Sequence, residues 1–578
     1  MTSAYDRYRA ADLDLPEQSW TWFLHGAGED NMGKDSAPEL APIPSPDADH
    51  MLVRIDSVGL CFSDVKIMRQ GGSHPKLYDR DLSQDPTRLG HEVSLTVIEV
   101  GENLQDRYHA GQRLAVQPDI YQDGRSTAYG YTIPGGLTQY HLMGAEMLET
   151  DDGACLLPLP DTMGYAEGST LEPWGCVMAA YTQRRRLEPR AGGTMWVIGR
   201  PGDERVYEFS AGLDAPATIV LTDVPASVVE MVERTSAATV VRDGITTDDY
   251  QALVDELTDG AGFDDIVVLD PRSATTVGAV ATHIARRGTL NLVGETALDG
   301  LVDTDVGRLH YDYTAYIGDR GPDIAASYGE ARNRCDLRSQ GTTVFVGAGG
   351  PMGLMHVQRA IQQPGGPRKI VATEVSDERL KALEDRLGHL AHKNDCELIT
   401  FNSQTADQSL RDFVMGLTDN RGADDVVVSV PISEVMAEAD TLMNADGMLV
   451  FFAGVPNGTL APLNLSAVYL DNAQYTGTSG LTIHDQQQVV DLANQGDLSP
   501  GSIVGAVGGM RAAKDGLQAL VDGRYSGKVL IFPQIHDLPL VGLDELKDTL
   551  PDVAAKLGAG DTWNDEAERA LFDSQLNV

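Results

Sequence analysis

Three stretches of the chain carry side chains that can hold a catalytic metal ion. Cys61 lies in "VGLCFSDVK", His91 and Glu92 lie in "RLGHEVSLTVIEVG", and Glu172 lies in "TLEPWGCVMAAY". A thiolate, an imidazole and a carboxylate form a three-ligand zinc set whose fourth position stays open to a substrate. Each residue also has a structural interpretation: a small buried cysteine, a core histidine with satisfied nitrogens, or a charge at a helix N-terminus.

A glycine-rich turn indicates a dinucleotide site. In "TTVFVGAGGPMG" (342–353) an apolar strand runs into a series of glycines, and the helical pattern "MGLMHVQRAIQQ" follows. Glycine lets the backbone approach a pyrophosphate, whose charge then meets the helix N-terminus. A tight turn without a ligand is the alternative. We therefore expect the cofactor to contact Gly347, Gly349, Gly350, Pro351, Met352 and Gly353.

One acidic residue favours NAD over NADP. In "KIVATEVSDERL", Glu374 lies at the end of the second predicted strand of this unit, the strand that follows the glycine turn and its helix. A carboxylate at this place accepts both ribose hydroxyls and repels a 2'-phosphate.

The chain carries the same strand and turn twice, and the first copy is altered. "TMWVIGRPGD" (194–203) has Arg200, Pro201 and Asp203 in the turn. Further on, "ELTDGAGFDDIVVLD" (256–270) matches "GLTDNRGADDVVVSV" (416–430), which predicts two nucleotide-type domains in tandem. Because an aspartate facing a pyrophosphate is repulsive, we expect the first copy to bind no dinucleotide, although it keeps the acidic Asp223. Chance similarity between two strand and helix units is the alternative.

Composition limits the partners. The 578 residues carry a formal net charge of -42, which repels nucleic acid and anionic membranes. No apolar run is long enough for a membrane helix, and the first residues lack the pattern of a signal peptide. Five widely spaced cysteines do not form the pattern of a disulfide framework. We expect a cytoplasmic protein.

The motifs "GLCxSD", "GHE", "GxxxxY", "EPxxxxxxA" and a glycine turn occur in one order. This set resembles the zinc-dependent medium-chain dehydrogenase family, especially its sorbitol dehydrogenase and sorbose-phosphate reductase members, over about 50–190 and 340–534. The resemblance implies an α/β protein with a GroES-like, mainly antiparallel catalytic domain and Rossmann-type, doubly wound parallel-sheet domains. The expected divisions are 1–190 catalytic, 191–338 degenerate Rossmann-type, 339–490 NAD-binding, 491–534 returning to the catalytic domain, and 535–578 an acidic helical tail.

The resemblance also implies roles for single residues. Cys61, His91 and a carboxylate, either Glu92 or Glu172, are the implied ligands of one catalytic zinc, with the other carboxylate nearby. Ser63 matches the hydroxyl that relays the substrate's proton, and Lys66 stands where many relatives carry histidine at the outer end of that relay. No structural zinc is expected, because the segment after "GHE" (116–140) contains no cysteine.

Duplication of the nucleotide domain departs from the family pattern. Dimers of the family join two such domains into one continuous sheet. We hypothesise that the degenerate copy supplies this neighbour within one chain, as the scaffold half of an internal pseudo-dimer. A homo-oligomer of separate chains is the alternative.

The implied reaction passes a hydride between NAD and a secondary hydroxyl or ketone of a polyol, sugar or sugar phosphate. Basic residues between Cys61 and His91 can bind a phosphate or carboxylate, or can be surface residues of a long loop. They are Lys66, Arg69, Lys76, Arg80 and Arg88. Two other functions stay open: a redox-neutral enzyme that eliminates or epimerises sugars with tightly bound NAD, and a non-catalytic NAD-binding sensor.

Overall fold

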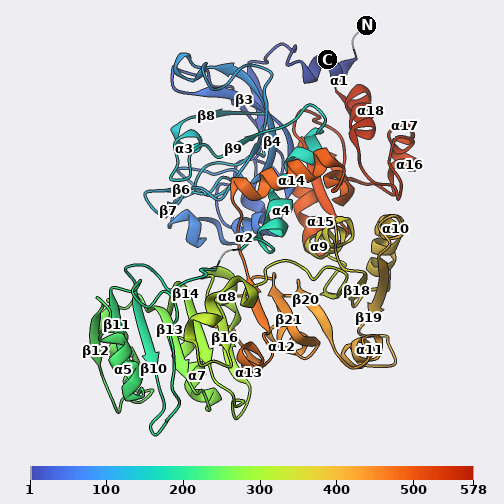
Figure 1. The fold of residues 1–578 in the computed structure, drawn as a ribbon. Helices are drawn as coiled ribbons and strands as arrows, with labels where there is room; N and C mark the ends of the chain where they lie inside the picture. The colour runs from blue at the N-terminus through green and yellow to red at the C-terminus, as the bar shows by residue number, and fades with distance from the viewer. Residues whose placement is uncertain (1–2, 184, 577–578) are drawn as a thin grey trace.

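The computed structural model describes residues 3–183 and 185–576, and two large sheets organise it (Figure 1). An eight-stranded, mainly antiparallel sheet is built from both ends of the chain. A twelve-stranded sheet uses the middle of the chain. Within the described residues, no helix combines the length and the apolar character that a membrane crossing requires.

The smaller sheet is the predicted antiparallel domain, and a strand from near the end of the chain belongs to it. Residues of "GKVLIF" form a strand that pairs antiparallel with the strand ending at Leu60. Its order is β26 (Val541–Gly542), β24 (Val504–Gly509), β25 (Lys528–Phe532), β3 (Met51–Leu60), β4 (Glu92–Val100), β5 (Arg113–Val116) and β9 (Leu156–Pro158), with β8 (Tyr140–Met143) paired to β3. Two short pairs accompany it: β1 (Gln18–Thr21) with β2 (Glu39–Pro42), and β6 (Tyr121–Gln122) with β7 (Arg125–Ser126).

Helices link this sheet to the rest of the molecule. The almost fully buried helix α4 (Tyr165–Ala179) packs on β3 and β4 and contacts α14 (Ile483–Gln495). The predicted boundary at residue 490 therefore falls inside α14, whose Gln486 donates a hydrogen bond to the Val116 carbonyl of β5. The other helices here are α2 (Phe62–Gln70), α3 (Ala145–Leu148) and α15 (Ala513–Asp522).

The acidic C-terminal segment packs against the N-terminus. It contains α16 (Leu546–Thr549), α17 (Pro551–Ala554) and α18 (Asp565–Gln575), and α1 (Ala4–Arg9) lies against α18. Tyr5, Tyr8, Tyr165 and Phe572 share one buried cluster. Helix α18 also reaches α4, because the Glu568 carboxylate accepts hydrogen bonds from the backbone N–H groups of Tyr165 and Ala166 at 2.8 and 2.7 Å.

The larger sheet consists of two six-stranded halves with the same strand order. The first half reads β12 (Ala238–Val241), β11 (Thr218–Thr222), β10 (Thr194–Ile198), β13 (Phe263–Leu269), β14 (Ile284–Val293) and β16 (Ala315–Asp319). The second continues through β23 (Gln474–Gly477), β21 (Met443–Phe451), β20 (Ala423–Val428), β17 (Thr342–Val346), β18 (Lys369–Glu374) and β19 (Glu397–Asn402). Numbered within each half, both have the order 3-2-1-4-5-6 of a dinucleotide-binding fold.

The two halves join into one sheet, as the pseudo-dimer hypothesis requires. Tyr316 of β16 pairs antiparallel with Tyr475 of β23, whereas the strand pairs inside each half are parallel. A second contact is the antiparallel pair β15 (Val302–Asp305) and β22 (Leu460–Leu463). One hydrophobic cluster contains residues of both halves, so they share a core.

The halves differ in the helices that cover them (Figure 1). The first is covered by α5 (Ala226–Val232), α6 (Tyr250–Thr258) and α7 (Ala274–Ala281), and the second by α9 (Pro351–Gln362), α10 (Asp377–Lys393), α11 (Leu410–Leu417) and α12 (Ser433–Asp440). Two short helices cross the joint: α8 (Val306–Tyr311) packs on β21 and β23 of the second half, and α13 (Ser466–Leu470) packs on β14 and β16 of the first. Helix α9 follows the glycine turn, but residues 199–217, in the same place of the first half, form no helix.

Candidate active site

Cys61, His91 and Glu92 come together where β3 ends and β4 begins. Cys61 follows β3 at the start of α2, and Glu92 is the first residue of β4. Because Gly59 pairs with Glu92 across the two antiparallel strands, the end of one meets the start of the other. One ligand atom from each of the three residues lies within 4.8 Å of the other two. Gly59 leaves room for the site, since a Cβ there would lie 2.2 Å from Glu92 Oε2.

Asp64 holds the cysteine and histidine in place. Its buried carboxylate accepts hydrogen bonds from the backbone N–H groups of Cys61 and Gly90, both at 2.9 Å, and lies 3.3 Å from His91 Nδ1. Burial alone would lower the pKa of His91, but the Asp64 carboxylate raises it well above its usual range. A carboxylate on one ring nitrogen fixes the imidazole's orientation and leaves the other nitrogen for a ligand.

Lys528 balances the charge of Glu92, and sequence reasoning missed it. Lys528 Nζ donates to Glu92 Oε1 at 2.5 Å, and both residues are buried. The other carboxylate oxygen, Oε2, is buried without a hydrogen-bond partner. A lysine at the start of the apolar strand "KVLIF" was the only available signal, and it does not indicate a partner more than 400 residues away.

Glu172 lies beside the three ligands but is not part of their 4.8 Å group. Burial raises its pKa to about 7, with the charge of His91 lowering it and that of Glu92 raising it further. The Cys176 thiol donates to Glu172 Oε1 at 3.7 Å. A carboxyl group with such a pKa can accept or release a proton near neutral pH.

The predicted relay residue Ser63 contacts a tyrosine that the sequence did not single out. Burial raises the pKa of Tyr131 to about 12, although the hydrogen bond with Ser63 opposes the shift. The Tyr131 ring lies 5.8 Å from that of His91 and 5.6 Å from that of His74. Lys66 is exposed, and its charge acts on His74, whose pKa is lowered by burial and then by Lys76 and Lys66.

Some basic residues between Cys61 and His91 hold the backbone in place, whereas others are free to contact a substrate. Arg80 donates to the backbone carbonyls of residues 85, 86 and 132, and the half-buried Arg88 donates to the carbonyl of residue 135. Lys76 Nζ lies 5.1 Å from the centre of the Tyr131 ring and 3.5 Å from Asp119. Lys66 and Arg69 are exposed. Lys76 and Lys66 are therefore the cations on the side of Tyr131 and His74.

The intact glycine turn has the geometry of a phosphate cradle. Gly347 has a φ of +81°, which favours glycine, and Gly350 is the N-cap of α9 with open space where a Cβ would be. A Cβ on Gly353 would lie 2.2 Å from the Gly347 carbonyl, so the helix packs directly on the turn. Pro351 occupies the first helical position, where a missing N–H costs nothing. Met352 is partly buried against the adjacent hydrophobic cluster.

Glu374 lies next to this turn. Its carboxylate accepts hydrogen bonds from the backbone N–H groups of Gly349 at 3.2 Å and Val375 at 2.8 Å. Only glycine fits at 349, because a Cβ there would lie 2.6 Å from Glu374 Oε2. The acidic residue and the glycine turn thus form one feature at the carboxyl ends of β17 and β18.

The turn of the first copy is occupied by its own side chains. Arg200 forms an ion pair with Asp270 at 2.5 Å, and Asp203 accepts hydrogen bonds from the Arg205 N–H and the Tyr207 hydroxyl. Without a following helix, the turn offers no helix N-terminus to a phosphate.

The structure joins an antiparallel domain that carries the cysteine, histidine and glutamate site to a dinucleotide-type sheet. Residues 47–150 match the family model of the alcohol dehydrogenase GroES-like domain. The crystal structure of AibC has a similar fold, with a TM-score of 0.50 and 15% identity over 89% of this chain and 96% of that one.

Two curated relatives align along almost the whole chain. Mannitol-1-phosphate 5-dehydrogenase of Aliivibrio fischeri is 24% identical over 94% of this chain and 97% of its own length. L-sorbose 1-phosphate reductase of Klebsiella pneumoniae is 22% identical over 93% of this chain and 95% of its own. Over almost its whole length the chain is therefore similar to these two relatives, and its residues 47–150 are similar to the GroES-like domain of alcohol dehydrogenases.

Proposed function

We propose that the chain is a zinc-dependent oxidoreductase that transfers a hydride between NAD and a secondary hydroxyl or ketone of a polyol, sugar or sugar phosphate. The observation that carries the proposal is the convergence of Cys61, His91 and Glu92 at the strand ends. The intact glycine turn with Glu374 supplies the cofactor half of the same chemistry.

The residues present fit a zinc ion. Glu92 Oε2 is buried without a partner and belongs to the same group of ligand atoms as Cys61 and His91. A thiolate, an imidazole and a carboxylate are ligands that zinc prefers. We assign Glu92 rather than Glu172 as the third ligand, because Glu92 lies inside the 4.8 Å group. When bound, zinc supplies a Lewis acid that lowers the pKa of a substrate hydroxyl.

The chain's own groups handle the substrate's proton. The Ser63 hydroxyl lies next to that of Tyr131, whose ring lies beside His91, so the serine can pass a proton outward through hydroxyl groups. His74 and Lys66 lie on the outer side of this pair, and we assign Lys66 to the solvent end of the relay. Glu172, with a pKa of about 7, is a second group that can take up a proton.

The proposed substrate class rests on the cations beside Tyr131 and His74 and on the relatives. Lys76 and Lys66 offer charges for a phosphate near Tyr131 and His74. The two full-length relatives are named for a mannitol phosphate and a sorbose phosphate. A phosphorylated polyol or ketose is accordingly the first substrate to test.

For the cofactor, Glu374 supports NAD. Its carboxylate is 8% exposed next to the phosphate turn, where it can accept ribose hydroxyls and would repel a 2'-phosphate. One zinc and one NAD per chain complete the proposal.

The test is nicotinamide absorbance with NAD or NADP and a panel of polyols, sugars and their phosphates, then NADH with the matching ketoses. We expect NAD-dependent turnover with one group of substrates. Cys61→Ala should lose zinc and about 100-fold or more of the activity, whereas Cys155→Ser, a buried cysteine elsewhere in the domain, should retain both.

Other outcomes would replace the proposal. No net NADH from protein that holds zinc and NAD would favour a redox-neutral sugar-modifying enzyme. Protein that binds NAD but no zinc would favour a non-catalytic sensor.

A further inference from the structure

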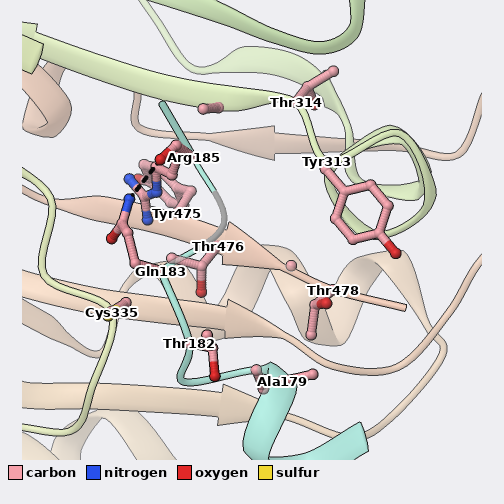
Figure 2. Close-up of a pocket in the computed structure, with 13 residues that line it drawn as sticks. Ala179, Thr182, Gln183, Arg185, Tyr313, Thr314, Cys335, Tyr475, Thr476 and Thr478 are labelled. Atoms are coloured by element: carbon pink, nitrogen blue, oxygen red, sulfur yellow. Dashed lines mark hydrogen bonds between the residues drawn. The ribbon is translucent and has the colours of Figure 1, made fainter. Parts of the chain in front are cut away.

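A cavity lies where the two halves of the large sheet meet, and the proposed reaction does not use it (Figure 2). Four parts of the chain line it: the end of α4 with residues 180, 182, 183 and 185, the residues at the start of β16, Cys335, and strand β23 with the residue after it. Its polar lining includes Thr182, Gln183, Arg185, Thr314, Cys335, Thr476 and Thr478. None of the proposed zinc ligands lines it.

The lining holds an unusual concentration of buried polar atoms without partners. Both terminal nitrogens of Arg185, Nη1 and Nη2, are buried and make no hydrogen bond. The hydroxyl oxygens of Thr314, Thr476 and Thr478 are in the same state. Each such group costs about 1–3 kcal/mol if nothing satisfies it, and more if it is charged. Five such atoms around one cavity indicate that a bound molecule or ion satisfies their hydrogen bonds together.

The neighbouring arginines, unlike Arg185, form ion pairs with aspartates. Arg186 forms an ion pair with Asp265 at 3.0 Å, and Arg190 pairs with Asp264 at 2.8 Å. The second copy repeats both pairs, with Arg334 on Asp425 and Arg338 on Asp424. In each half, these ion pairs join the segment before the first strand to the fourth strand in chain order.

Arg185 has no counterpart among these pairs. The repeat that aligns Arg186 with Arg334 aligns Arg185 with Asn333, whose amide donates to three backbone carbonyls. Among residues 3–183 and 185–576, no carboxylate forms an ion pair with Arg185. Asp485, which accepts a hydrogen bond from the lining residue Thr182, also accepts from Thr482.

Arg185 keeps its charge in this environment. Burial lowers its pKa to about 10, and Cys335 opposes the shift, so the guanidinium stays protonated at neutral pH. A buried cation without a countercharge is strongly destabilising, which makes a bound anion the natural complement.

We propose that this cavity binds a small oxyanion of the phosphate or sulfate class. The guanidinium of Arg185 supplies a two-pronged donor that matches the geometry of an oxyanion, and the hydroxyls of Thr476 and Thr478 supply further donors. The site lies at the seam, since Tyr475 of the lining pairs with Tyr316 of the other half. The bound anion therefore joins the two halves of the sheet.

The experiment measures unfolding midpoints and isothermal titration calorimetry of the full chain with inorganic phosphate or sulfate in place of chloride, at constant ionic strength. We expect one binding event per chain that depends on Arg185 and a stabilisation that grows with ligand concentration, by about 2.7 kcal/mol at 100 times Kd. An equal response to chloride would contradict the assignment to oxyanions.

Two variants locate the effect. Arg185→Gln removes the uncompensated cation, so it should fold at least as stably as the parent chain in phosphate-free buffer and lose this response to phosphate. Arg190→Gln, in the same connection but outside the cavity, should keep the response. A response unchanged in Arg185→Gln would place phosphate at the nucleotide turn or the catalytic cleft and overturn the proposal. A crystal structure in phosphate with only water in the cavity would do the same.

Discussion

At the scale of residues, the candidate active site depends on side chains that neutralise one another. Cys61, His91 and Glu92 provide the ligand atoms, while Asp64 supports the first two and Lys528 pairs with the third. Ligand geometry of this kind is set as much by such supporting contacts as by the ligands. The site is therefore sensitive to changes at residues that never touch the substrate.

Lys528 provides the test at this scale. Lys528→Met leaves the Glu92 carboxylate buried without its cation, and we expect a loss of about 3–5 kcal/mol in the free energy of unfolding together with a lower zinc content. Urea unfolding and metal analysis measure the two effects. Lys528→Arg keeps the charge and should recover most of both.

Lys556→Met is the matched control, because Lys556 forms an ion pair with Glu566 on the surface. It should change stability by no more than about 0.5 kcal/mol. Equal effects of Lys528→Met and Lys556→Met would contradict the role of the buried pair.

At the scale of elements, helix α4 connects the termini to the active site. It carries Glu172, and its first N–H groups are capped by Glu568 of α18. A carboxylate at a helix N-terminus satisfies free donors and complements the helix dipole. The acidic C-terminal segment thus positions a helix of the site.

The cap makes stability depend on pH. Burial raises the pKa of Glu568 from 4.5 to about 7, so the folded chain retains a proton that the unfolded chain releases between these values. The contribution to stability is fully present below pH 4.5 and is lost as the pH rises through 7. As the pH rises through this range, the free energy of unfolding of the parent chain should fall by roughly 3 kcal/mol relative to that of Glu568→Gln, as measured by urea unfolding. Glu566→Gln, on the exposed side of α18, should show the same pH dependence of stability as the parent chain. If Glu568→Gln also showed that pH dependence, the Glu568 carboxyl would not be its source.

At the scale of the whole molecule, one chain builds a continuous twelve-stranded sheet from two nucleotide-type halves. The halves share a core and a strand order, but only the second has a glycine turn followed by a helix. The first half extends the sheet of the second half at strand β23. Its nucleotide turn therefore has no chemical task in the proposed reaction.

Binding stoichiometry tests this division of labour. Isothermal titration calorimetry should give one NAD per chain. Gly350→Asp places a carboxylate in the open space of the intact turn, and repulsion of the pyrophosphate should weaken binding by roughly tenfold or more. Gly202→Asp makes the same change in open space at the first turn and should leave binding unaltered. A second NAD, lost in Gly202→Asp, would mean that the first half binds cofactor.

Local pattern in the sequence was enough to single out the motifs that the structure places at the candidate site. The ligand motifs lie at the ends of strands, and the glycine turn lies between a strand and a helix, so each is specified by residues that are neighbours in the chain. The repeat likewise predicted two nucleotide-type domains, and the structure has two halves with the same strand order. Such features follow from periodicity and turn chemistry, which are properties of short segments.

Only the tertiary structure decided the contacts between distant segments. The pairing of Lys528 with Glu92, the cap that Glu568 places on α4, and the joint between Tyr316 and Tyr475 all link residues more than 150 positions apart. Lysine, glutamate and tyrosine are common on protein surfaces, so their types alone indicate no partner. Their roles arise from burial, which makes an unpaired polar group costly and so selects the one neighbour that can satisfy it.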